Sequence, residues 1–315
     1  MQILAGARRV ISFVAGAAAA IAVMTLSHAP SAAQLTYPTP SDAFKALIVA
    51  ARAEDTKALI NVLGSEGESL VVSGDPVADK EALHRFVSAY DEANRIELQG
   101  ADRATLVVGK EEWPFPIPAV KRKDSWYLDS AAGKEEILDR RIGRDELSVI
   151  EVCRAYVDAQ REYASMDRNK DGYIEYAQKF LSSPGKHDGL YWPTSEGEEP
   201  SPLGPLVAEA QAAGYTVGNT HEKPIPYYGY YYRILKGQGV HAPGGAYDYV
   251  VNDHMIGGFA LVAYPAQYGV SGITTFIVNH DGVIYQNDLG PKTTSIAEKM
   301  KLFDPGAGWT KQQQN

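Results

Sequence analysis

Apolar positions in residues 34–142 recur first with a helical period and then with a strand period. The helical spacing places Phe44, Leu47 and Ala51 on one side of a helix that Ser41 is expected to cap. Further helices are predicted over 56–63 and 79–94, and short strands over 96–98, 105–108, 117–120 and 126–128. Sequential strands with short connections predict an antiparallel meander. We therefore expect an α+β half in which helices cover one curved sheet, as in the NTF2 or cystatin plan.

Residues 143–315 predict one long helix followed by a second, small sheet. Leu147, Ile150, Cys153 and Val157 recur at helical spacing in an amphipathic helix expected over 144–166, after a link over 132–142. One more turn is expected over 175–181 and a short helix over 206–213. Strands are predicted over 228–235, 259–264, 274–278 and 283–285, with an Asp-Gly hairpin turn before the last. The expected plan is a long helix on a small antiparallel sheet, with a domain boundary between 142 and 143.

The first 33 residues carry the pattern of a secretory signal peptide. Arg8 and Arg9 precede an apolar stretch over 10–26, and Pro30 and small residues follow up to Ala33. This order of segments predicts export with cleavage near Ala33. The alternative is an uncleaved anchor, because the apolar stretch is near the shortest length that spans a bilayer. We expect a periplasmic or secreted protein with no stable membrane anchor after cleavage.

The charge of the chain excludes some classes of partner. The 315 residues include 39 acidic and 30 basic side chains, for a formal net charge of −9. The predicted signal segment holds two arginines and no acid, so the rest of the chain is more acidic still. An acidic body without a basic stripe argues against binding to nucleic acid or to anionic membranes. The expected partner is an envelope protein or a glycan.

Single residue types offer few candidates for catalysis. Cys153 is the only cysteine, and its helical spacing predicts burial, with a nucleophilic role as the alternative. The seven histidines contain no His-x-His or His-x-x-x-His pair, so no zinc site or catalytic dyad is predicted. The tyrosines of 227–232 are expected to pack in a strand, with a glycan-stacking platform as the alternative.

The segment after the long helix has the spacing of a calcium loop. Asp167, Asn169, Asp171 and Glu175 match loop positions one, three, five and nine, and a glycine follows Asp171. Oxygen side chains at alternate positions are how such a loop wraps its ion. Position twelve is Gln178 instead of a bidentate glutamate, so weak affinity is expected. The alternative is a turn that ends the helix, with Asp, Asn and Gly chosen for turn geometry.

Several long motifs resemble a known family. They include Trp-Pro-Phe-Pro at 113–116, Arg-Arg-Ile-Gly at 140–143, Asp-Gly-Tyr-Ile-Glu-Tyr-Ala-Gln at 171–178 and Ala-Tyr-Pro-Ala-Gln-Tyr-Gly-Val-Ser-Gly at 263–272. Together with 184–193 and 275–290, they are similar to the bacterial envelope family catalogued as domain of unknown function 2950. The resemblance covers nearly the whole chain after residue 33. It implies an exported protein and assigns no catalytic residue.

The second half also resembles the globular part of type II secretion pseudopilins. That resemblance implies a long helix, here 144–166, against a small antiparallel sheet over 228–285. Pilins begin with a membrane-spanning helix and a processing motif, whereas this chain has a signal peptide and a whole domain in that place. Assembly of fibres by the pilin route is therefore in doubt.

No phosphate loop, dinucleotide fingerprint or nucleophile elbow occurs in the sequence. We therefore expect a non-enzymatic envelope protein, binding or structural, with a weak calcium loop. The alternative is a hydrolase of envelope polymers that uses carboxylates in a cleft between the two halves.

Overall fold

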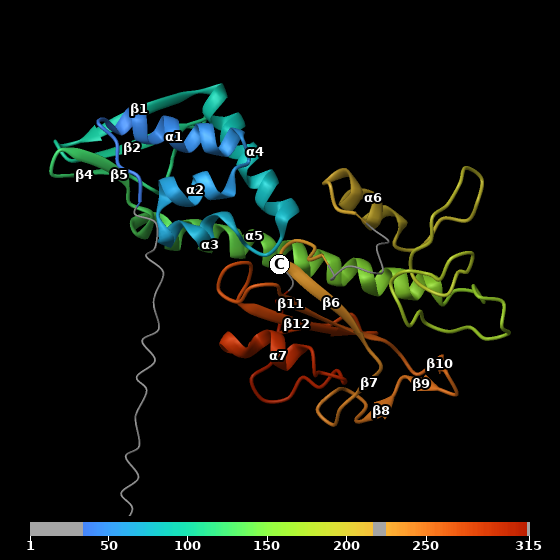
Figure 1. The fold of residues 1–315 in the computed structure, drawn as a ribbon. Helices are drawn as coiled ribbons and strands as arrows, with labels where there is room; N and C mark the ends of the chain where they lie inside the picture. Colours follow the sequence, from blue (N-terminus) through green and yellow to red (C-terminus); the bar gives the residue numbers. More distant parts are fainter. Residues whose placement is uncertain (1–33, 217–224, 314–315) are drawn as a thin grey trace, which may run out of the picture. The chain divides into compact units, whose positions relative to one another are not determined.

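The computed structural model describes residues 34–216 and 225–313. The predicted signal peptide and its cleavage site near Ala33 lie outside these residues. Helices and antiparallel strands occupy separate stretches of the described chain, which confirms the α+β class (Figure 1).

Helices come first, as predicted from the apolar spacing. They are α1 (Pro40–Arg52), α2 (Thr56–Leu63), η1 (Ser65–Gly67), α3 (Glu68–Val71) and α4 (Pro76–Glu92). The cap of α1 is Thr39, not Ser41, because the Thr39 hydroxyl accepts the Asp42 N–H and a proline occupies the first helical position. Helix α4 begins at Pro76 instead of residue 79, because Asp75 accepts the N–H groups of Val77 and Ala78. Short polar caps therefore set both helix starts.

The first sheet is the predicted antiparallel meander. Its strands are β1 (Asn94–Gln99), β2 (Arg103–Val108), β3 (Trp113–Pro114), β4 (Ala119–Arg122) and β5 (Ser125–Leu128), in the order β1-β2-β4-β5 with β3 on β2. Side chains from α1, α2 and this sheet form one core, with Phe44, Leu59, Leu106, Ile117 and Leu128 almost fully buried.

Helix α5 (Ser130–Tyr163) is longer than predicted and includes the expected link over 132–142. The sequence did not predict a helix over 132–142, because most of these residues are polar. Its tertiary anchors lie far away in sequence: the Ser130 hydroxyl donates to the Leu63 carbonyl at 2.7 Å, and Gly133 packs directly on the Pro116 backbone. The domain boundary at residue 142 stays a prediction, and α5 runs through it.

The second sheet has the order β14-β13-β12-β11-β6, all antiparallel (Figure 1). Its strands are β6 (Tyr230–Leu235), β11 (Ala260–Pro265), β12 (Thr274–Asn279), β13 (Ile284–Asp288) and β14 (Thr310–Lys311). Val278 pairs with Ile284 across the predicted hairpin, whose turn has Gly282 at a φ of +78°. Two short ribbons lie beside it: β7 (Gly237–Gln238) with β8 (Tyr247–Asp248), and β9 (Val250–Val251) with β10 (His254–Met255). The remaining elements are α6 (Gly204–Ala212), η2 (Gly290–Lys292) and α7 (Thr293–Ala297).

The second core lies between α5 and this sheet. Tyr156, Cys153, Tyr230, Phe259 and Phe276 are almost fully buried there. Burial raises the pKa of the Cys153 thiol to about 12, so the thiolate that a nucleophile needs is disfavoured. The predicted burial of Cys153 is confirmed.

The turn predicted over 175–181 is not helical. Gln160 of α5 explains the difference, because its side-chain amide bonds both backbone groups of Ala177. Those groups are therefore satisfied across the core and not along a helix. Among the described residues, none of the helices combines the length and the apolar character needed to cross a bilayer.

Candidate metal centre

The loop that follows α5 is wound by bonds from its own side chains to its backbone. The two carboxylate oxygens of Asp167 accept the N–H groups of Asp171 and Gly172, at 3.2 and 2.9 Å. Asp171 in turn accepts the Tyr173 N–H at 3.0 Å. Gly172 has a φ of +96°, a conformation that favours glycine and lets the chain reverse here. This is the turn geometry that the sequence offered as the alternative to a calcium loop.

Three of the four predicted ligands nevertheless converge. The Asn169 amide nitrogen donates to Asp171 Oδ2 and to Glu175 Oε1, both at 2.7 Å. Rotating the Asn169 side-chain amide by half a turn would place its oxygen where the nitrogen now lies. An oxygen is the atom that a cation requires there. Asp167 does not join the group, because both of its oxygens face the loop backbone.

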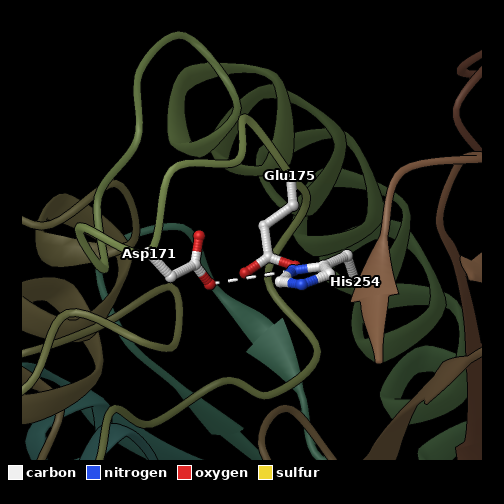
Figure 2. Close-up of side chains that lie close together, drawn as sticks. All are labelled: Asp171, Glu175 and His254. Atoms are coloured by element: carbon white, nitrogen blue, oxygen red, sulfur yellow. Dashed lines mark hydrogen bonds and ion pairs between the residues drawn. The ribbon is translucent and has the colours of Figure 1, made fainter. Parts of the chain in front are cut away.

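A fourth residue comes from a distant strand. His254 lies in β10, and its Nδ1 atom is 3.2 Å from Glu175 Oε2 and 3.7 Å from Asp171 Oδ2. Figure 2 shows the two carboxylates and the imidazole pointing toward one another. One ligand atom from each of these three residues lies within 4.8 Å of the others. Sequence spacing missed His254, because 79 residues separate it from Glu175.

Backbone pairing and ring stacking hold β10 against the loop. Met255 donates its N–H to Glu175 Oε2 at 3.2 Å, and its carbonyl accepts the Tyr176 N–H at 2.8 Å. The Tyr173 ring stacks on the His254 imidazole with centroids 3.9 Å apart and planes at 26°. Two backbone bonds therefore hold β10 beside the loop, and the Tyr173 ring orients the imidazole, all without an ion.

The group is partly shielded from water. The side-chain exposures are 11% for Glu175, 21% for His254 and 35% for Asp171. Two carboxylates this close repel each other more strongly as solvent is excluded. A bound cation would relieve that repulsion.

Position twelve of the calcium-loop pattern is turned away from the group. The Gln178 amide nitrogen donates to the Asp253 carbonyl, and its oxygen accepts the Lys236 ammonium at 3.0 Å. Gln178 therefore does not supply the closing ligand of an EF-hand loop. The additional group beside the two carboxylates is His254 on β10. Two carboxylates and one imidazole form a ligand set that suits Zn²⁺ or Mn²⁺. The sequence pattern predicts a Ca²⁺ site in which all ligands are oxygens.

Arg168 anchors the start of the loop and was not singled out by the sequence. Its side chain is only 3% exposed, donates to the Glu162 and Tyr163 carbonyls, and pairs with Glu199 at 2.7 Å. Burial raises the pKa of the neighbouring Tyr163, and the nearby charge of Glu175 adds to the effect. The bonds of Arg168 therefore fix the start of the loop to the last turn of α5.

The other sequence candidates lie apart from this group. His187 stacks on Trp192 with ring centroids 4.1 Å apart, and His241 pairs with Asp304 at 3.0 Å. Tyr230 is fully buried and donates to the Thr274 carbonyl at 2.9 Å, while Tyr231 is half-buried. Tyr230 and Tyr231 are therefore packed in the second core, as expected for this strand.

Comparison with known proteins identifies the family. Neither a curated protein nor a solved structure matches the chain. The pseudopilin resemblance of the second half is therefore not confirmed. The family model described as "Protein of unknown function (DUF2950)" matches residues 34–312, which is almost all of the described chain. The chain accordingly belongs to the DUF2950 family, the family that its sequence motifs resemble.

Proposed function

We propose that this chain is an exported, non-enzymatic binding or structural protein of the cell envelope, and that a divalent cation ties its 167–175 loop to strand β10. The observation that carries the cation is the convergence of Asp171, Glu175 and His254 from segments far apart in the sequence. The N-terminal pattern of positive, apolar and small residues supports export.

A cation here would act on structure. It would neutralise the repulsion between the Asp171 and Glu175 carboxylates and join them to β10, which lies about 80 residues later in the chain. The site opens to solvent on the Asp171 side, which is 35% exposed, so exchange with ions in the medium is allowed. Zn²⁺ or Mn²⁺ would take His254 as well as the two carboxylates and so join the loop to β10. Ca²⁺ would use only the oxygens of Asn169, Asp171 and Glu175 and would order the loop alone.

The alternative of a hydrolase has less support. Glycoside-type hydrolysis needs two carboxylates facing one cavity. Three of the pockets in the described residues have volumes of about 390–480 Å³, and each of these three has at most one acid in its lining. The buried Asp75 instead caps α4 and accepts the Tyr215 hydroxyl at 2.8 Å. Asp75 therefore has a structural role, which supports a binding or structural protein.

Thermal melting of the purified protein tests the cation. The protein is first stripped with a chelator and then melted with Ca²⁺, Zn²⁺ or Mn²⁺ added separately. An ion at about 100 times its Kd stabilises the folded state by about 2.7 kcal/mol. For a chain of this size, that corresponds to a rise in Tm of roughly 5–10 °C.

Variants separate the ions and control for charge. Glu175→Gln should abolish the rise with every ion, because it removes one carboxylate of the group. His254→Asn should abolish the rise with Zn²⁺ and Mn²⁺ but keep it with Ca²⁺. Glu135→Gln is the matched control, since Glu135 is exposed on α5. No change in Tm with any of the three ions would overturn the cation proposal.

Export is tested separately. The N-terminal sequence of the protein recovered from the periplasm or medium should begin just after Ala33. An uncut chain retained in the inner membrane would contradict it.

A further inference from the structure

The N-terminal half has a largely apolar pocket of about 390 Å³ that is open to solvent. Helices α1, α2, α3 and α4, residues 113–117 and the first half of α5 line it. Fourteen of the nineteen lining residues are apolar, among them Leu47, Leu63, Leu83, Phe86 and Ile137. Sites for small ligands commonly have volumes of about 300–1,000 Å³ and mostly apolar walls. The cavity therefore has the size and lining of a small-ligand site.

Helix α4 shows that this space is unfilled. Its apolar residues are spaced to face a core, yet none of its seventeen residues is buried. Leu83, Phe86 and Ala89 are partly buried against the core and also line the pocket, with Phe86 stacked on Phe115 at 4.8 Å between centroids. Protein interiors contain few voids larger than a water molecule. An apolar helix face on a hollow of this size indicates room for an apolar guest.

The charged residues in the lining itself are mostly basic. The remaining lining residues are Asp79, Arg85, Arg140, Arg141 and Arg144. Three of the four arginines have carboxylate partners. These pairs are Arg85 with Glu81, Arg140 with Glu136, and Arg144 with Asp145.

Arg141 is the exception. Its guanidinium donates to the Ser69 and Leu70 carbonyls, and no described carboxylate lies within 4.0 Å of it. Burial lowers the pKa of Arg141, which shows that its charge is partly desolvated. Asp79 and Asp145 attract the Arg141 charge from beyond ion-pair distance, and burial raises the pKa of Asp79. A desolvated guanidinium with neutral partners favours an incoming anion.

Trp113 supplies a second group without a partner. Its ring lines the cavity under the Arg140 guanidinium, 5.4 Å from the ring centroid. The indole N–H is buried and has no hydrogen-bond partner among the described residues. The Trp113 ring therefore contributes an apolar wall and an aromatic face for Arg140.

We propose that this cavity binds an amphipathic anion, with one acyl chain against α4 and an anionic head at Arg141. One chain fits the volume, the walls are apolar, and the cationic residue without a carboxylate partner lies in the lining. The head is a carboxylate or phosphate, and its source is a free fatty acid or a single-chain phospholipid. The proposal does not depend on the cation at Asp171 and Glu175.

Tail length and head charge test the proposal. Titration calorimetry measures the binding of straight-chain carboxylates of eight, ten and twelve carbons. Each is kept below its micelle concentration, and a chelator is present. The Kd should fall roughly fourfold for each added methylene. Dodecanoate should bind at least about tenfold more tightly than dodecylamine, which has the same tail and the opposite charge. The same titration with lysophosphatidylglycerol distinguishes the two sources, because tighter binding than dodecanoate would indicate a single-chain phospholipid. Equal affinity for dodecanoate and dodecylamine, or no binding by any arm, would overturn the proposal.

Variants locate the site. Ala82→Phe places a ring in the cavity and should abolish binding without lowering the Tm, whereas Ser88→Phe, on the exposed side of α4, should leave binding unchanged. Arg141→Gln should weaken dodecanoate roughly tenfold or more and leave dodecanol unaffected. Dodecanoate should also change the fluorescence of the protein, and Trp113→Phe should remove that change. Unchanged binding in Ala82→Phe would place the ligand elsewhere and refute the assignment.

Discussion

Gln160 links α5 to the segment that leads into the candidate metal centre, so replacing it with methionine should destabilise the protein. Its side chain is fully buried, donates to the Ala177 carbonyl at 2.8 Å and accepts the Ala177 N–H at 2.8 Å. It also donates to the Tyr156 hydroxyl at 3.1 Å. Methionine keeps the length and the unbranched shape of the side chain but offers no comparable donor or acceptor.

The magnitude follows from the groups left without partners. Ala177 is 2% exposed, so its N–H and its carbonyl would both lose their partners out of reach of bulk water. Each such group costs about 1–3 kcal/mol. The hydroxyl of Tyr156 still donates to the Ala260 carbonyl, so its loss is smaller. Burial of the methionine offsets roughly 1 kcal/mol. We expect Gln160→Met to lower the free energy of unfolding by about 2–4 kcal/mol.

Urea unfolding followed by circular dichroism measures this change, with Gln211→Met as the control. Gln211 is exposed near the end of α6, so the same substitution there should change the free energy of unfolding by less than about 0.5 kcal/mol. Amide exchange at Ala177 should also speed up in Gln160→Met. A loss below about 1 kcal/mol with an unchanged m-value would refute the reasoning, because Ala177 would then have found other partners.

Two further predictions concern α5 and a buried acid. Gly133→Ala should destabilise the protein by more than about 1 kcal/mol, because a Cβ atom there would lie 2.6 Å from the Pro116 backbone. Gly143→Ala in the same helix meets nothing within 4 Å and should stabilise it by up to about 1 kcal/mol, so equal thermal shifts in the two variants would contradict the packing. Desolvation raises the pKa of Asp145 to about 6, so the folded chain binds this proton more tightly than the unfolded chain. Stability should therefore fall by up to about 3 kcal/mol as the pH rises from about 4 to 6. Asp145→Asn should flatten that slope, and an unchanged pH profile by urea unfolding would argue against it.

Local patterns sufficed for much of the fold. The helical spacing of Phe44, Leu47 and Ala51 depends only on which residues can share one face, and all three are buried. The strand runs, the Asp-Gly hairpin and the burial of Cys153 follow from equally short-range rules, and the structure has each of them.

Predictions failed where a distant contact decided the local state. Residues 132–142 look like a link because they are polar, yet Gly133 fits against the Pro116 backbone and the segment is helical. Residues 175–181 look able to form a turn of helix, yet Gln160 takes up both backbone groups of Ala177. In both cases a partner outside any local window supplies the hydrogen bond or the close contact.

The candidate site divides along the same line. Spacing alone determined that Asp167, Asn169, Asp171 and Glu175 share one loop, since alternate positions of a tight turn lie close together. Only the tertiary structure decided that Gln178 turns toward Asp253 and that β10 brings His254 to the carboxylates. The physical reason is that a turn is stabilised by bonds within a few residues, whereas a ligand set drawn from two segments exists only after the chain between them has folded.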